Sequence, residues 1–457
     1  MDDGFQPSQP LIPQSESPNG ESVHWRVALE ADLLHETNEA IDSVTEHLLG
    51  FELTQLDWQL LCEMGLLFCY RQISGSLSGL EHAATECLNL AIDRVSHEGS
   101  SVPSGLVGGL SGIGWIVQHV NGLFRDVLGA EVADVDDLLD DLDRVLLNRL
   151  GEPAWREGYD LIGGLVGIGT YLLERLPARH APRGLERIVL ILKATALRDA
   201  DGIYWYTPPP QVNNHLKGYY NLGVAHGIPG IAYLLAQAVH VGIESDTAGR
   251  LLEGTVAWLQ AQDRSLHHVQ RFGCWIVPGG GQLDSRLGWC YGDLGIGASL
   301  HEVARTVGRK DWQAFAGDLV GGTFAWPEEK NLIFDAGLCH GAIGVAHIHN
   351  RMWQATDDER YRQEANRWYR RGLELRRPGC GPGGFYSSRP DKDQPYSEDR
   401  SLISGSIGAA LGLISAVYPV EPQWDRMLLL SSRFTRRQDA GVPESQCPPC
   451  PLQQRAR

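Results

Sequence analysis

Apolar positions along the chain recur with the period of an α-helix, in stretches separated by glycine-rich breaks. The segments "DVDDLLDDLDRVLLNRL" (134–150) and "RGLERIVLILKATAL" (183–197) carry apolar residues at every third or fourth position, which is the spacing of one helix face. Alternating patterns typical of strands are few. The pattern therefore predicts a mainly helical protein.

The glycine-rich breaks form an internal repeat. A Gly-x-x-Gly motif followed by small and apolar residues occurs six times, and successive copies start 49 to 65 residues apart. The first glycines of the copies are Gly109, Gly164, Gly227, Gly292, Gly341 and Gly405. Each unit is interpreted as one glycine-started helix plus one amphipathic helix. Residues 28–48 and 58–73 are a candidate seventh unit that lacks the glycine signature.

The two helix types of each unit differ in the faces that they can bury. The glycine-started helices are apolar nearly all round and are expected to be buried, whereas the amphipathic helices between them should lie outside. Such repeats either stack into an open solenoid or close into a ring. Small residues in the inner helices and the repeat number favour closure. We expect an all-α fold, an α/α toroid of about seven inner and seven outer helices; the alternative interpretation of the glycines is close helix packing and nothing more.

Composition narrows the classes of function. The chain of 457 residues is 43% hydrophobic and 21% charged, with a net charge of −18, which argues against nucleic acid or an anionic membrane as the main partner. No run of about 18 apolar residues indicates a transmembrane helix. Nine scattered cysteines without a secretory signal are typical of a cytoplasmic protein.

The chain ends differ in composition from the repeat region. Residues 1–25 are acidic and rich in Pro and Ser, and are expected to form a disordered tail. The predicted toroid domain spans residues 26–437, and residues 438–457, with the Cys447/Cys450 pair, form an expected flexible tail. The loop of residues 201–220 interrupts the helical pattern with aromatic residues and prolines. It is either a small β-rich element or a surface excursion.

Candidate chemistry occurs at one position of the repeat, the two residues before the first glycine. This slot is filled by small or aliphatic residues in some copies, but it holds Ala225-His226, Cys290-Tyr291 and Cys339-His340 in three consecutive copies. In a closed ring these residues would face one central cavity. Two Cys and one His are ligands that zinc prefers, and three protein ligands leave a position for water or substrate. The alternative is two buried core cysteines and a hydrogen-bonded histidine.

Three motifs carry a resemblance to a known family. "WCYGDLG", "LCHGAIG" and "NLGVAHGIPG" resemble the motifs of the lanthionine synthetase cyclase (LanC-like) family, and the resemblance covers roughly residues 30–435. It implies a toroid of seven inner and seven outer helices with a single zinc ion (Zn2+) at its centre. The implied metal ligands are Cys290, Cys339 and His340.

The resemblance also implies an activity. Members of the bacterial branch add Cys thiols to dehydroalanine or dehydrobutyrine in a dehydrated precursor peptide, which forms (methyl)lanthionine thioether rings. His226 matches the family's catalytic histidine, and Asp160 matches an acidic residue that could orient it. Asp160 is alternatively an ordinary helix N-cap, four residues before Gly164.

Two further residues match family positions near the metal. Arg286 lies four residues before Cys290 and could stabilise enolate charge, because its guanidinium group stays cationic; the alternative is an ordinary ion pair. Tyr291 follows the cysteine directly. Which of these groups donates the final proton stays open at this point.

Partners follow from the same resemblance. Because the chain contains no dehydratase domain, a separate dehydratase should supply the precursor peptide, and association with an exporter could bring the protein to a membrane. Two rival functions remain. One is a LanC-like zinc protein that binds glutathione or a partner protein without cyclase activity; the other is an α/α-toroid hydrolase or terpenoid-type enzyme, for which paired carboxylates at the slot are missing.

Overall fold

The computed structural model describes residues 25–75, 79–125, 135–151, 155, 157–208, 218–265, 268–388 and 395–434. Residues 1–24, the expected C-terminal tail with Cys447 and Cys450, and part of the 201–220 loop lie outside this set. The described residues fall into two compact units. The first contains those up to Pro103, Ile113–Leu139 and Ile333–Trp424; the second contains Ser104–Gly112, Asp140–Leu332 and those from Asp425 onward.

Helices make up most of both units. The first unit contains α1 (Leu34–Leu49), α2 (Trp58–Ile73), α3 (Leu80–Glu98), α13 (Ala342–Thr356), α14 (Glu359–Glu374) and α15 (Ser406–Val417). The second contains α6 (Leu165–Arg175), α7 (Ala181–Thr195), α8 (Ile228–His240), α9 (Ser245–Ala261), α10 (Asp293–Val307), α11 (Lys310–Gly322) and α12 (Glu328–Asn331). Helices α4 (Leu110–Leu123) and α5 (Asp136–Leu150) contribute residues to both.

Shorter elements complete the described structure. The 3-10 helices are η1 (Ala31–Leu33), η2 (Leu53–Gln55), η3 (Gly99–Ser101), η5 (Thr323–Ala325), η6 (Pro382–Gly384) and η7 (Gln423–Leu428). Three antiparallel two-stranded pairs are β1 (Leu197–Arg198) with β2 (Ile203–Tyr204), β3 (Tyr220–Asn221) with β4 (Trp275–Ile276), and β5 (Ser387–Ser388) with β6 (Tyr396–Ser397). The 201–220 loop thus contributes one strand to each of the first two pairs.

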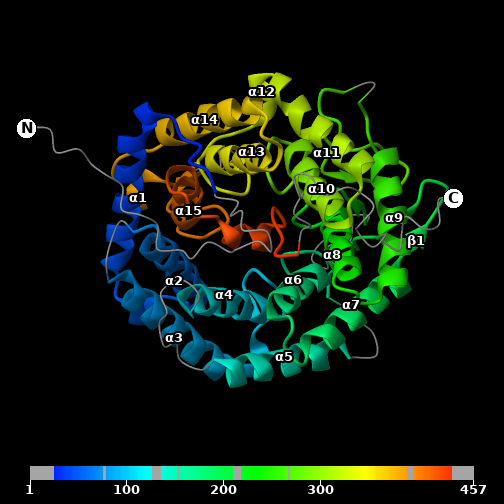
Figure 1. Ribbon diagram of the computed structural model, residues 1–457, viewed down its shortest axis with the longest axis horizontal. Helices are drawn as coiled ribbons and strands as arrows, with labels where there is room; N and C mark the ends of the chain where they lie inside the picture. Colours follow the sequence, from blue (N-terminus) through cyan, green and yellow to red (C-terminus); the bar gives the residue numbers. More distant parts are fainter. Residues whose placement is uncertain are drawn as a thin grey trace, which may run out of the picture. The chain divides into compact units, whose positions relative to one another are not determined.

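Within each unit, a buried helix packs against a helix with a polar face. The pairs are α2 with α3 and α13 with α14 in the first unit, and α6 with α7, α8 with α9 and α10 with α11 in the second (Figure 1). Every residue of α6 is buried, whereas α7 alternates buried and exposed positions. The predicted division into buried glycine-started helices and amphipathic helices is confirmed for the four pairs that begin with α6, α8, α10 and α13. Helix α2 occupies the predicted range 58–73, but it packs against α3 and not, as predicted, mainly against the helix of residues 28–48.

A shared turn precedes the buried helices. The first glycine of the motif is the N-cap residue of five of them, namely Gly164, Gly227, Gly292, Gly341 and Gly405. None of these caps uses a side chain. Instead the loop returns over the helix start, so that the Leu165 N–H donates to the Gly158 carbonyl oxygen at 3.1 Å and the Ala342 N–H to that of Asp335 at 2.9 Å. These bonds satisfy backbone donors that a helix start leaves without partners.

The second glycine of the motif makes room for the returning loop. A Cβ atom at Gly295 would lie 1.9 Å from the carbonyl oxygen of Trp289, six residues earlier. Gly344 and Gly408 have the same relation to the residues six positions before them. The expected close packing against a neighbouring helix occurs at Gly297, two residues after the second glycine of its copy. A Cβ at Gly297 would lie 2.6 Å from Val320 of α11.

Gly292 has an additional backbone requirement. Its φ angle is +89°, in the region where side chains are strained, and a Cβ there would lie 2.3 Å from the Arg286 carbonyl oxygen. Only glycine fits both conditions, which fixes how the segment before α10 approaches the helix.

Among the described residues, no helix combines the length and apolarity that a membrane crossing requires.

Candidate active site

Within each unit, backbone hydrogen bonds connect the slot before a buried helix to the slot of the next repeat. In the second unit, Val107 donates to Ile162 at 3.0 Å and Ala225 donates to Cys290 at 3.5 Å. In the first unit, Cys339 donates to Ile403 at 2.8 Å. Equivalent positions of successive repeats are therefore neighbours within each unit, as the repeat predicts.

A glycine four residues before the N-cap allows this close approach. A Cβ at Gly223 would lie 2.5 Å from the Cys290 carbonyl oxygen and from the Tyr291 ring, and one at Gly337 would lie 2.7 Å from the Ser404 carbonyl oxygen. Larger residues at these positions would push consecutive slots apart. The spacing of four between glycines was a signal available in the sequence, although it had no obvious role there.

Cys290 lies directly before α10, and Cys339 and His340 lie directly before α13. Cys290 is buried, with 7% of its surface exposed, whereas Cys339 and His340 are half-buried. The N-terminal end of a helix carries partial positive charge and favours the thiolate form of a nearby cysteine. Both cysteines thus have the environment of metal-binding or reactive thiols.

Cys290, Cys339 and His340 form a group of side chains that could hold a metal ion. Two thiolates and one imidazole are a donor set that suits zinc, and three protein ligands are typical of a site that keeps one position for a reactant. The donor chemistry of these residues therefore fits the predicted cofactor.

His226 and Asp160 form a hydrogen-bonded pair in the second unit. His226 precedes the N-cap of α8, and its Nδ1 donates to Asp160 Oδ2 at 2.7 Å. The other carboxylate oxygen, Oδ1, accepts the Gly163 N–H at 2.8 Å. The His226 side chain is 44% exposed and that of Asp160 24%. A carboxylate on Nδ1 directs Nε2 of the imidazole toward a reactant.

Tyr291 lies beside this pair. Its ring stacks on the His226 ring at 6.5 Å between centroids, and its hydroxyl group accepts a hydrogen bond from Asn221 Nδ2 at 3.3 Å. Burial raises the pKa of Tyr291 to about 12, which keeps the hydroxyl protonated at neutral pH. The Trp275 ring meets Tyr291 edge-on at 6.1 Å. Asn221 and Trp275 were not singled out from the sequence, although Asn221 is part of the quoted "NLGVAHGIPG" motif.

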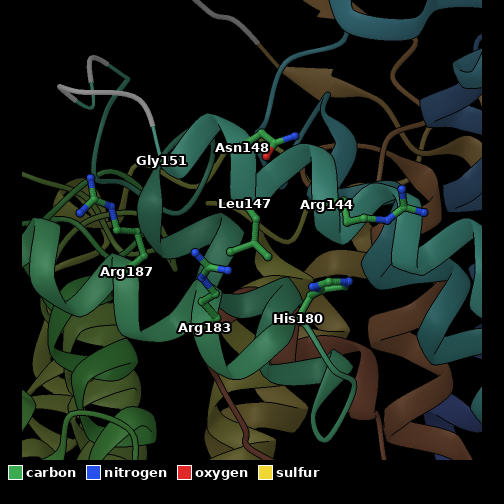
Figure 2. Close-up of a pocket in the computed structure, with 7 residues that line it drawn as sticks. All are labelled: Arg144, Leu147, Asn148, Gly151, His180, Arg183 and Arg187. Carbon is green, nitrogen blue, oxygen red and sulfur yellow. The ribbon is translucent and has the colours of Figure 1, made fainter.

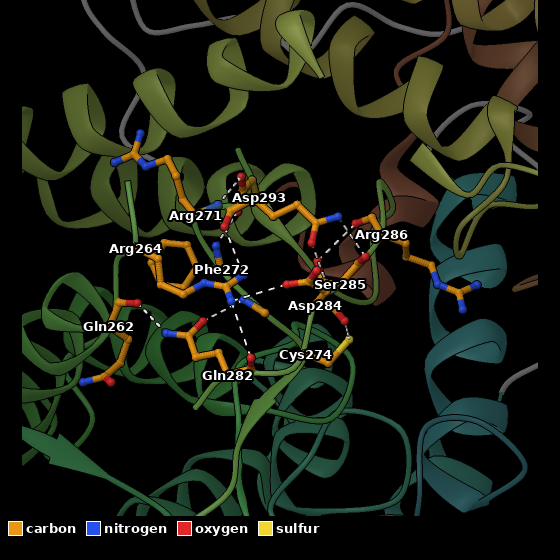
Figure 3. A network of polar contacts seen from close by, with 12 residues as sticks. Gln262, Arg264, Arg271, Phe272, Cys274, Gln282, Asp284, Ser285, Arg286 and Asp293 are labelled. Carbon is orange, nitrogen blue, oxygen red and sulfur yellow. Dashed lines mark hydrogen bonds and ion pairs between the residues drawn. The ribbon is translucent and has the colours of Figure 1, made fainter. Parts of the chain in front are cut away.

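Arg286 is half-buried and points away from the polar network around it (Figure 3). Its guanidinium group makes no ion pair with any carboxylate of the described residues, so the interpretation as an ordinary ion pair gains no support. The charge of Arg286 lowers the pKa of Cys274, although burial is the larger effect and raises that pKa to about 11 overall. Arg286 is therefore a cation close to the segment that carries Cys274 and Cys290.

A buried network holds the segment that precedes α10 (Figure 3). The Asp293 carboxylate accepts the N–H groups of Arg271 and Phe272 at 3.0 and 2.7 Å. Gln270 bonds Ser285 in both directions, through its amide nitrogen at 3.0 Å and its amide oxygen at 3.1 Å. These contacts fix the backbone shortly before Cys274 and immediately before Arg286.

Comparison with known proteins agrees with this arrangement. Residues 63–429 match the family described as lanthionine synthetase C-like protein. The chain belongs to this family. The solved structure of nisin cyclase superimposes on this LanC-like chain with a TM-score of 0.67 and 17% sequence identity, over 88% of this chain and 98% of nisin cyclase. The match confirms the predicted all-α toroid fold, and the family match confirms the resemblance carried by the three motifs.

Proposed function

We propose that this LanC-like protein is a zinc-dependent lanthipeptide cyclase. It would join Cys thiols to dehydroalanine or dehydrobutyrine residues of a dehydrated precursor peptide, which closes (methyl)lanthionine rings. The observation that carries the proposal is that the Cys₂His group and His226 occupy the same position of the repeat, with His226 hydrogen-bonded to Asp160. Neither a bare binding module nor a carboxylate-based hydrolase requires this combination.

Cys290, Cys339 and His340 would hold the zinc ion. When bound, zinc supplies the positive charge that keeps the thiol of the substrate deprotonated near neutral pH, where a free thiol with a pKa of about 8.5 is mostly protonated. The helix starts of α10 and α13 favour the ligand thiolates themselves.

His226 is proposed to move the proton of the reaction. The substrate sulfur bonds to Cβ of the dehydroamino acid, the C=C electron pair shifts to give an enolate, and Cα then takes a proton. The thiol proton lost at the start balances the proton gained at Cα. With Nδ1 bonded to Asp160, Nε2 of His226 is the atom available for both transfers.

Arg286 and Tyr291 are proposed to support the enolate. A guanidinium cation without a carboxylate partner among the described residues can stabilise developing negative charge. The Tyr291 hydroxyl can donate a hydrogen bond at the same stage. Both groups would stabilise the negatively charged enolate more than the neutral alkene, so they would lower the barrier of the reaction.

The proposed substrate requires a separate partner that dehydrates Ser and Thr in the precursor. Association with that dehydratase, and with an exporter of the finished peptide, belongs to the same proposal. A cyclase of this kind would act in the cytoplasm, where the precursor is made.

The deciding experiment is thiol counting. Purified protein with zinc is incubated with a dehydrated precursor peptide, free thiols are alkylated, and the products are weighed by mass spectrometry. Ring closure should protect thiols at a rate above that of the peptide alone. Complete alkylation after incubation would reject the cyclase function and favour a LanC-like protein that binds glutathione or a partner.

A further inference from the structure

A second concentration of functional groups lies on α5 and α7, in the second unit. A cavity of about 780 Å³ is lined by Arg144, Leu147, Asn148, Gly151, His180, Arg183 and Arg187. Three of these seven residues are arginines, one is a histidine and none is acidic. This basic lining contrasts with the acidic chain as a whole, whose net charge is −18. We name it the basic groove.

The basic groove is formed by one face of each helix (Figure 2). His180, the N-cap residue of α7, is followed by Arg183 and Arg187 at the spacings of three and four that keep side chains on one helix face. Arg144, Leu147 and Asn148 repeat that spacing on α5, and Gly151 follows its last residue. Because an α-helix rises 1.5 Å per residue, Arg183 and Arg187 lie about 6 Å apart along α7. The cations form a strip.

The arginines are available to a ligand. The Arg183 side chain is exposed and makes no ion pair or hydrogen bond with another side chain among the described residues. Arg187 donates from Nε to the Leu150 carbonyl oxygen at 2.9 Å, which fixes its orientation and leaves its terminal nitrogens. Arg144 pairs with Asp141, but both side chains are exposed, at 60% and 66%, and such a pair is weak and easily exchanged.

We propose that the basic groove binds an extended acidic peptide segment. Guanidinium groups match carboxylates through two parallel hydrogen bonds. Alternate residues of an extended chain lie about 6.6 Å apart, at ~3.3 Å per residue, so carboxylates at alternate positions would meet Arg183 and Arg187. Leu147 provides an apolar contact beside them. A single phosphate ion would engage only part of this strip.

This binding site does not depend on the proposed cyclase chemistry. The test is fluorescence anisotropy with the full chain and a labelled peptide that carries Glu at alternate positions, compared with the same peptide carrying Gln. The acidic peptide should bind at least about tenfold more tightly at low salt, and the difference should shrink at higher ionic strength because exposed charges are screened.

Charge reversal locates the site. Arg183→Glu with Arg187→Glu should weaken binding of the acidic peptide by about tenfold or more, whereas Arg183→Lys with Arg187→Lys should retain most of it. The matched control is Arg367→Glu with Arg371→Glu, two exposed arginines four residues apart on α14. It changes net charge equally and should leave binding unchanged.

Several results would overturn the proposal. Equal affinity for the Gln peptide, or equal loss in the α14 control, would mean that no specific site exists. Tighter binding of inorganic phosphate or of a short oligonucleotide, abolished by the Arg183/Arg187 reversal, would assign the groove to another ligand. Cys290→Ala should bind the acidic peptide normally, so failure of the cyclase proposal would leave this result intact.

Discussion

The carboxylate of Asp160 divides its two oxygens between the Gly163 N–H and the His226 ring. The first contact belongs to the loop before α6, and the second reaches a residue in another repeat. The N-cap interpretation of Asp160 is wrong, because Gly164 is the N-cap residue of α6 and its cap uses no side chain. Asp160 instead holds the turn before the helix and is the partner of the histidine. Substitutions of Asp160 can separate the contribution of the Gly163 contact from that of the His226 contact.

Asp160→Asn should lower the kcat of ring formation by about 10²-fold, because the amide keeps an acceptor for Gly163 but loses the charge that stabilises protonated His226. His226→Asn serves as the reference for complete loss of proton transfer. Unchanged kcat in Asp160→Asn, with a loss of stability only in Asp160→Ala, would show that the residue only holds the turn before α6.

At the scale of the element, the glycine motif allows the preceding loop to fold back over the first turn of the helix. The clearest example is Gly295, because the carbonyl oxygen of Trp289 occupies the space that a Gly295 side chain would need. The slot residues are held in that turn. Packing of α10 against α11 then depends on Gly297.

Gly295→Ala should destabilise the protein by at least about 2 kcal/mol, because its Cβ would overlap a backbone oxygen that has no room to move. Gly317→Ala, in the interior of α11, is the matched control. No atom lies within 4 Å of its Cβ position, so it should stabilise the helix by about 0.5–1 kcal/mol. Urea unfolding measures both, and similar effects of the two substitutions would contradict this account of the motif.

Glu63 of α2 should give the first unit a pH-dependent stability. Its side chain accepts the Leu402 N–H at 2.8 Å and a bond from Gln59, and burial raises its pKa to about 7 from a reference of 4.5. The folded protein therefore holds a proton that the unfolded chain has released between these pH values. Stability is highest below pH 4.5 for this group and falls as the pH rises through 7.

Glu63→Gln tests this effect, because an amide mimics the protonated carboxyl and cannot ionise. The wild-type protein should lose stability on the order of 3 kcal/mol between pH 4.5 and pH 8 from this group, whereas the variant should lack that part of the slope. Chemical denaturation at several pH values measures it. Parallel slopes for the two proteins would show that Glu63 is already ionised when folded.

At the scale of the whole molecule, the proposed function requires one zinc ion per chain. Metal analysis should find one zinc in the wild-type protein and less than about 0.1 in Cys290→Ala, Cys339→Ala or His340→Ala, because two remaining ligands bind zinc weakly. Cys274→Ala is the control, since Cys274 lies in the same segment as Cys290 but outside the ligand group. Zinc retained in Cys290→Ala would reject the ligand set.

Much of the site was accessible from the sequence, for a physical reason. The starts of the buried helices and the slot before them follow from local turn chemistry, so Gly164, Gly227 and Gly341 could be placed without any long-range contact. The residues proposed as metal ligands could be singled out because a repeat puts equivalent positions in equivalent places. The basic groove gave no such signal, since its arginines belong to two separate helices of unremarkable composition.

The sequence by itself determined the helical class, the repeat and the residue types at the slot, because helix periodicity and glycine turns depend on neighbours along the chain. Only the tertiary structure decided which side chains meet. Asp160 and His226 are 66 positions apart and Asn221 and Tyr291 are 70 apart, and their contacts exist because packed helices bring successive turns together. Contacts of that kind depend on packing geometry, which local residue preferences do not specify.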